Sequence, residues 1–164
     1  DQVVSQVDLF PTIVETVGAA ADESMQDLSG SSLWPALDGV EADRLGFGEY
    51  HASCSKTGSF FLRRGDHKLI YHAHMPRELY DLSADPHEVR DLLLDSTDQS
   101  AKALADDLEA ELRAVCDPES VNARAKADQR DRVNELGGND VIASMGALIR
   151  TPPPGTDVVL DKTG

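Results

Sequence analysis

The chain has few of the residues that build disulfide-rich, membrane-spanning or nucleic-acid-binding proteins. Among its 164 residues are two cysteines, Cys54 and Cys116, too few for a disulfide framework. No apolar run reaches the length of about 18 residues that a transmembrane helix needs. Lys and Arg number 15 against 30 Asp and Glu, and the net charge of -15 repels nucleic-acid phosphates and anionic lipid. Neither a nucleic acid nor a membrane is therefore expected as a partner.

The first residues also lack the features of a signal peptide. The chain opens with Asp1-Gln2-Val3-Val4, without a start methionine or a basic segment. This beginning predicts a start within a longer protein. It leaves the location open between a bacterial-type cytoplasm and a periplasm.

What is present predicts an α+β fold whose first part, residues 1–46, is the end of a larger domain. Residues 8–17 are predicted to be a helix, with Asp8 as N-cap and Gly18 just beyond its end. Its apolar positions recur every four residues: Leu9, Ile13 and Val17. The short apolar run at 33–37 predicts one helical turn that fixes the following loop onto the core.

Residues 47–116 predict a small antiparallel β-sheet covered by one amphipathic helix. Four runs have strand character: Phe47–Tyr50, Ser59–Arg64, Lys68–His72 and Glu78–Asp81. Gly65-Asp66 predicts a hairpin turn between the middle two. The helix is predicted over about 99–115, with Ser96 at capping-box spacing. Its apolar stripe comprises Ala101, Leu104, Leu108, Leu112 and Val115.

Residues 117–164 predict an extended polar helical tail with a Pro-rich strap. Asp117-Pro118 is typical of a helix start, and few large apolar residues follow as far as Leu136. The run Thr151–Gly155 predicts an extended strap. Because so polar a helix cannot fold alone, it is expected to pack on the parent protein or on another subunit, as a homo-oligomer formed through the tail.

Several short motifs follow one another in a fixed order. They are V-D-L-F-P-T-I at 7–13, G-S-S-L-W-P-A-L at 30–37, R-R-G-D-H-K-L-I-Y at 63–71 and L-Y-D-L at 79–82, before Asp85-Pro86. As a set they closely resemble the C-terminal part of the sulfatase family, of the alkaline-phosphatase-like superfamily of metal-dependent ester hydrolases. The resemblance implies a fragment of a larger α/β hydrolase. Its partners would be the N-terminal catalytic domain of the same protein and a small-molecule sulfate ester, and Tyr80 would pack under the covering helix.

The resemblance also implies where the chemistry lies. The family uses formylglycine, made in a C/S-x-P-x-R motif, and a divalent cation, calcium or magnesium, held by Asp and Asn side chains of the N-terminal domain. The nearest match here, Cys116-Asp117-Pro118-Glu119-Ser120, ends in Ser instead of Arg. No catalytic residue and no metal ligand is therefore expected in this chain, and both cofactors are expected upstream.

The residues predicted to lie near substrate are His51, Glu49 and Lys56. Gly48-Glu49-Tyr50-His51 resembles a segment that reaches towards the cleft in one bacterial subgroup of the family. A histidine at a strand end can donate charge or a proton to the sulfate or the leaving group. The small residues after it predict an open rim, so that loss of His51 would change stability little. The alternative is a structural histidine bonded to a backbone carbonyl.

Two further clusters have simpler interpretations. Three histidines suggest a zinc site, but no cysteine accompanies them at metal-ligand spacing: His67, His72 and His74. Three basic residues are interpreted as a hairpin that balances acidic neighbours: Arg63, Arg64 and Lys68.

Two other functions stay open on the sequence. One is a phosphonate monoester or phosphodiester hydrolase of the same superfamily, and the other is a non-catalytic packing or oligomerisation module.

Overall fold

The computed structural model describes residues 2–19, 27–40, 44–51, 55–94 and 97–144. The chain divides into two compact units, residues 1–125 and 126–164. Cys54, Ser96 and the Pro-rich run at 151–155 lie outside the described residues.

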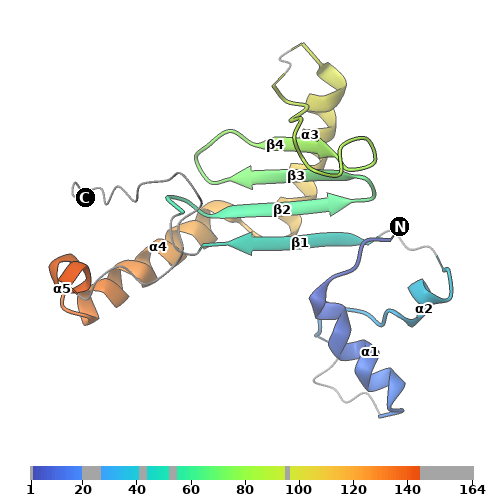
Figure 1. The fold of residues 1–164 in the computed structure, drawn as a ribbon, viewed down its shortest axis with the longest axis horizontal. Helices are drawn as coiled ribbons and strands as arrows, with labels where there is room; N and C mark the ends of the chain where they lie inside the picture. Colours follow the sequence, from blue (N-terminus) through green and yellow to red (C-terminus); the bar gives the residue numbers. More distant parts are fainter. Residues whose placement is uncertain (1, 20–26, 41–43, 52–54, 95–96, 145–164) are drawn as a thin grey trace. The chain divides into compact units, whose positions relative to one another are not determined.

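The described residues of the N-terminal segment form the 3-10 helix η1 (Gln6–Asp8) and the short helices α1 (Leu9–Thr16) and α2 (Trp34–Leu37), of which Figure 1 labels α1 and α2. Gly18 lies just beyond α1 with φ +65, as predicted for a residue that ends a helix. Asp8 is the N-cap residue of α1, as predicted, but its side chain makes no capping hydrogen bond to this helix. Its Oδ2 accepts a hydrogen bond from the backbone N–H of Ser5 at 2.8 Å, because the chain is already helical before α1 begins.

The apolar side chains of this segment are largely exposed. The predicted stripe of α1 is solvent-accessible, with Leu9, Ile13 and Val17 between 52% and 69% exposed. The prediction that the 33–37 turn fixes its loop onto the core is also wrong, since Leu37 is 70% exposed. Periodicity correctly identified an apolar face, but nothing in the described part of the chain covers it.

The sheet is a four-stranded antiparallel meander, in agreement with the α+β prediction (Figure 1). Its strands run in sequence order: β1 (Leu45–Tyr50), β2 (Ser59–Arg64), β3 (His67–His72) and β4 (Glu78–Asp81). Gly65, with φ +56, lies in the tight turn between β2 and β3. Because β1 stands first in the order, it forms one edge of the sheet.

Helix α3 (Gln99–Val115) covers one face of this sheet and closes the core. The cluster of buried side chains comprises Phe60, Leu62, Leu69, Leu79, Ala101, Ala105, Leu108 and Leu112. The cap is Asp98, whose Oδ1 accepts hydrogen bonds from the N–H groups of Ser100 and Ala101, both at 3.0 Å. Val115 is 51% exposed, so the predicted stripe ends one turn earlier.

Tyr80 does not pack under this helix, contrary to the expectation. Successive strand residues point to opposite faces, and Leu79 is the neighbour that joins the core under α3. The Tyr80 hydroxyl donates a hydrogen bond to Glu78 Oε2 at 2.6 Å. This bond to a carboxylate, together with burial, raises the pKa of Tyr80 well above its ordinary value.

Helix α4 (Pro118–Glu135) begins on the core of the first unit. Pro118 is fully buried, and Val121 packs against the core cluster. Glu119 accepts hydrogen bonds from Arg113 of α3, at 2.8 Å from Nη1, and from the Tyr71 hydroxyl of β3. These bonds hold the pKa of Glu119 at about 2. The first turns of α4 are therefore fixed to both α3 and the sheet.

In the second unit, α4 ends before two glycines with positive φ, and α5 (Asn139–Ser144) follows. The polar composition of this part matches the predicted polar helical tail. Along the described ranges, no helix combines the length and the apolar character needed to cross a bilayer.

Candidate functional site

One end of the sheet brings together the residues predicted to lie near substrate. Tyr50, Ser59 and His72 occupy neighbouring register positions where β1 ends, β2 begins and β3 ends. His51 follows β1 directly, and Lys56 lies in the segment that leads into β2. Because antiparallel strands alternate in direction, the loop between β1 and β2 lies at the same end as the turn between β3 and β4.

His51 is enclosed more tightly than an open rim would require. Its side chain is 17% exposed. The imidazole stands edge-on to the Phe60 ring, with 5.3 Å between centroids and 77° between planes. Gly58 also lies close to the imidazole, since a Cβ added at Gly58 would lie 2.6 Å from His51 Cε1. The ring is thus held in one orientation by its packing.

Glu49 and Lys56 are more accessible than His51. The Glu49 side chain is 45% exposed, and its Oε2 lies 3.8 Å from Nε2 of His51. The carboxylate therefore lies beside the imidazole on the accessible side of this end of the sheet. Lys56 is exposed, so its ammonium group is available to an approaching anion.

The segment before β2 is held by a residue that the sequence did not single out, Asn122 of α4. This side chain is 7% exposed in an otherwise polar helix. Its Oδ1 accepts a hydrogen bond from the backbone N–H of Gly58 at 2.7 Å. One buried Asn among exposed polar residues produces no periodic signal, so sequence patterns could not have found it.

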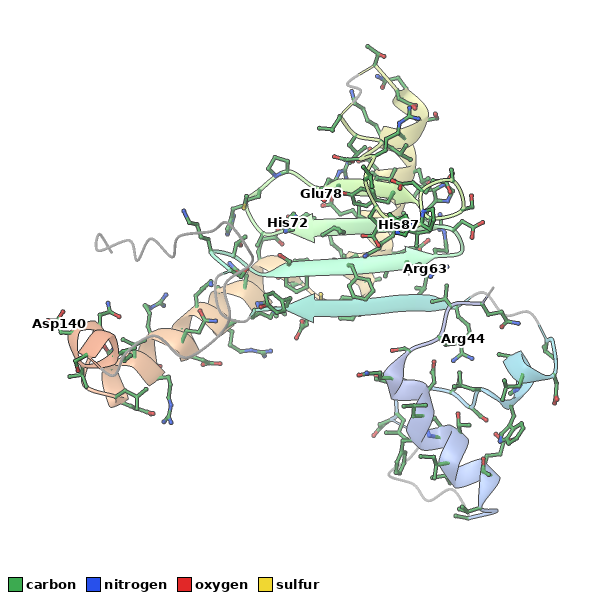
Figure 2. All side chains as sticks on the ribbon, viewed as in Figure 1. Arg44, Arg63, His72, Glu78, His87 and Asp140 are labelled. Carbon is green, nitrogen blue, oxygen red and sulfur yellow. The ribbon has the colours of Figure 1, made fainter. Side chains whose placement is uncertain are left out.

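A second polar cluster lies on the sheet face opposite α3. Ser59 Oγ and His72 Nδ1 are 2.8 Å apart, and His72 Nε2 lies 3.3 Å from Glu78 Oε1. Figure 2 shows His72 and Glu78 extending from neighbouring strands. His74 has left the strand, with φ +64. Within the described ranges, no three His, Cys, Asp or Glu side chains come together as a group able to hold a metal ion.

Two of the three basic residues of the hairpin have acidic partners, as interpreted from the sequence, whereas Arg63 Nε donates a hydrogen bond to the Gly65 carbonyl at 2.9 Å. Arg64 is paired with Glu111 of α3. Lys68 Nζ lies 2.8 Å from Glu88 Oε2 and 5.3 Å from the centroid of Phe61. The charges of Arg64 and Lys68 therefore stabilise the fold, and they do not form an anion-binding surface.

Cys116 caps the end of α3 and is half-buried. Burial and the nearby negative charge of Glu49 raise the pKa of its thiol. Since the thiolate is the nucleophilic form, this environment opposes a role for Cys116 as a nucleophile.

The family described as "N-sulphoglucosamine sulphohydrolase, C-terminal" matches residues 1–117, and the chain belongs to this family. The chain is therefore a C-terminal region of the sulfatase family, as its motifs indicated. It is 35% identical over 88 residues to choline-sulfatase of Rhizobium meliloti, covering 54% of this chain and 17% of that protein. It is 31% identical over 102 residues to arylsulfatase K of Mus musculus, covering 55% and 18%. The chain thus spans less than a fifth of these relatives.

Solved structures share the same fold. The crystal structure of Ps i-CgsB aligns with a TM-score of 0.58 and 25% identity, over 77% of this chain and 30% of that one. BT4656, solved with its substrate D-glucosamine-2-N,6-O-disulfate, aligns with a TM-score of 0.54 and 25% identity, over 68% and 25%. A phosphonate monoester hydrolase of Agrobacterium radiobacter aligns at 21% identity, with a TM-score of 0.50 over 70% and 25%, a likeness of fold alone.

Proposed function

We propose that this chain is the C-terminal region of an enzyme that hydrolyses sulfate esters. The observation that carries the proposal is the family match over residues 1–117. Choline-sulfatase and arylsulfatase K, both named for the hydrolysis of sulfate esters, support it.

The bond-breaking groups belong to the N-terminal catalytic part of the same protein. The sequence has no C/S-x-P-x-R motif. The ligating side chains that the structure describes do not gather at any one point, so they do not fit a metal ion. Formylglycine and a divalent cation, calcium or magnesium, are expected in the N-terminal part, and the isolated chain is expected to be inactive.

This chain contributes a polar edge to the substrate cleft, formed by His51, Glu49 and Lys56. The fixed orientation of the His51 imidazole suits it to donate a hydrogen bond or a proton to the leaving-group oxygen. The Glu49 carboxylate, with its Oε2 3.8 Å from His51 Nε2, lies beside this donor. Lys56 is an exposed cation in a chain of net charge -15, where it attracts an anionic ester towards this edge.

The N-terminal segment supplies the surface that docks on the catalytic part. Helix α1 exposes Leu9, Ile13 and Val17, and Phe10 is 55% exposed beside them. Covering each such side chain contributes roughly 1.5–3 kcal/mol. An amphipathic helix with this face uncovered is consistent with the end of a larger domain whose remainder lies elsewhere in the parent protein.

The test is an assay of the full-length protein and of residues 1–164 with an aryl sulfate and a divalent cation. Turnover is expected from the full-length protein and not from residues 1–164. A phosphonate monoester and a phosphodiester serve as parallel substrates, and faster hydrolysis of either would reject the sulfatase proposal. Turnover by residues 1–164 would show that the active groups lie in this chain.

The module alternative is tested by size measurement. A homo-oligomer that dissociates when residues 126–164 are removed, in a protein without hydrolase activity, would favour an oligomerisation module.

A further inference from the structure

We propose that Asn122 is a positioning residue that fixes the orientation of His51 through Gly58. This inference rests on the proposed function, in which the His51 imidazole faces the substrate. Asn122 lies beyond residues 1–117, the part that matches the family, so it adds a residue of α4 to the site.

The first step is the hydrogen bond between Asn122 and Gly58. Asn122 Oδ1 accepts from the Gly58 N–H at 2.7 Å, and both residues are buried. Gly58 precedes β2, and its N–H lies beyond the last pair of the β1–β2 ladder that the structure describes, Tyr50 and Ser59. The Asn122 side chain supplies the acceptor that a buried backbone donor requires.

The second step is that Gly58 is held on its other side as well. The Gly58 carbonyl accepts from the Ala73 N–H at 3.0 Å. The adjacent Thr57 Oγ1 donates to the Ala73 carbonyl at 2.6 Å and lies 3.5 Å from Asn122 Oδ1. The short segment before β2 is therefore fixed between α4 and the end of β3.

The third step links Gly58 to His51. A Cβ on Gly58 would lie 2.6 Å from Cε1 and 2.8 Å from Nδ1 of His51, so the backbone of Gly58 forms one wall of the space that the ring occupies. Phe60 forms another wall. When Gly58 shifts, the imidazole gains room to turn.

The start of α4 is rigid enough to act as the support. Pro118 is buried, Val121 packs on the core, and Glu119 is bonded to Arg113 and Tyr71. Positioning of a catalytic group depends on such fixed supports, and a displacement of about 1 Å can lower a rate by about 100-fold.

The experiment uses the full-length protein, an aryl sulfate and four variants: Asn122→Ala, Ser120→Ala, His51→Ala and the double variant Asn122→Ala/His51→Ala. Asn122→Ala is expected to lower kcat by about 5- to 50-fold and to change KM by less than about threefold, because orientation and not binding is lost. Ser120→Ala, the matched control at an exposed position of the same helix, is expected to stay within about twofold of the parent kcat.

The double variant tests whether Asn122 acts through His51. In the His51→Ala background, Asn122→Ala is expected to change kcat by less than about twofold. If Asn122→Ala lowers kcat by the same factor with and without His51, the two substitutions act independently and the proposal is overturned. Asn122→Asp, which keeps an acceptor oxygen for the Gly58 N–H, is expected to restore most of kcat. Should Asn122→Ala fail to fold, Asn122→Ser replaces it, because its shorter side chain does not span the bond.

A spectroscopic measurement separates this inference from the proposed function. In protein labelled at histidine Cε1, the His51 signal is assigned by its absence in His51→Ala. This signal is expected to move in Asn122→Ala and to stay in place in Ser120→Ala. If His51→Ala retains full turnover, the proposed role of His51 fails, and this signal alone decides whether Asn122 positions the ring. An unmoved signal overturns the inference.

Discussion

Gly58 and His51 are in such close contact that a Cβ on Gly58 would lie 2.6 Å from Cε1 of the imidazole. Real Cβ contacts are not this short, so a side chain at position 58 requires the ring to move. The absence of a side chain at Gly58 is therefore a condition for the observed orientation of His51.

Gly58→Ala is expected to lower the kcat of the full-length protein on an aryl sulfate by about 10-fold or more, because the displaced imidazole no longer faces the substrate. It is also expected to lower the thermal unfolding midpoint. In a His51→Ala background, the same substitution should lower the midpoint much less, because the clashing ring is gone. An equal decrease of the unfolding midpoint in both backgrounds would show that the close contact between Gly58 and His51 does not cause the destabilisation.

His51→Ala in the full-length protein is expected to lower kcat/KM by about 10- to 1000-fold, as the loss of one acid–base or charge-stabilising group does. His87→Ala, at an exposed position, is the matched control and should leave kcat/KM unchanged. Since His51 is 17% exposed and packs on Phe60, a loss of about 1 kcal/mol in stability is also expected, in place of the negligible change predicted for an open rim. Full turnover by the folded variant would make His51 a structural histidine.

Leu108→Ala is expected to lower the free energy of unfolding by about 2–5 kcal/mol, because it opens a cavity between α3 and the sheet. Leu108 is fully buried within the core cluster. Leu94→Ala is the matched control, since Leu94 is 82% exposed, and its effect should stay within about 0.5 kcal/mol. Chemical denaturation of both variants measures the difference, and similar values for the two would contradict the assignment of the core.

Asp8→Asn is expected to destabilise the chain at neutral pH and to matter less in acid. Burial alone would raise the pKa of Asp8, but hydrogen bonds from the Ser31 and Ser5 N–H groups and the Arg44 guanidinium, 2.8 Å away, outweigh it and lower the pKa below its ordinary value of 3.8. A carboxylate with a lowered pKa stabilises the fold above its ordinary pKa, and that contribution is lost as the pH falls through the folded-state pKa.

The measurement is the denaturation midpoint of the parent and of Asp8→Asn between pH 7 and acid. The difference between them is expected to be largest at neutral pH and to narrow below about pH 4. Asp38→Asn, at an exposed position, is the control and should show no comparable difference. A difference between the two midpoints that stays constant with pH would mean that the charge of Asp8 does not contribute to stability.

The sheet and its covering helix could be predicted because their signals are local. Alternation of apolar residues, together with Gly65 and the adjacent Asp66, predicted β2 and the turn to β3, and strand β3 was found to begin one residue before the predicted Lys68. The four-residue stripe predicted α3 and the burial of Leu108. Helix caps were less predictable. The N-cap of α3 is Asp98 and not the predicted Ser96. Several nearby side chains have the chemistry of a cap, and only the backbone geometry decides which of them accepts the hydrogen bonds.

The sequence by itself determined the family, the order of the strands and the end of the sheet at which His51 would lie. Tertiary structure alone decided what holds the wall of the space around His51, because Asn122 and Gly58, which are hydrogen-bonded, are separated by 64 positions. Periodicity indicates which faces of a helix or strand are apolar, but it does not indicate which hydrogen-bond donor pairs with which acceptor. That choice is made when α4 packs on the end of the sheet and the N–H of Gly58, removed from water, donates to Asn122 Oδ1.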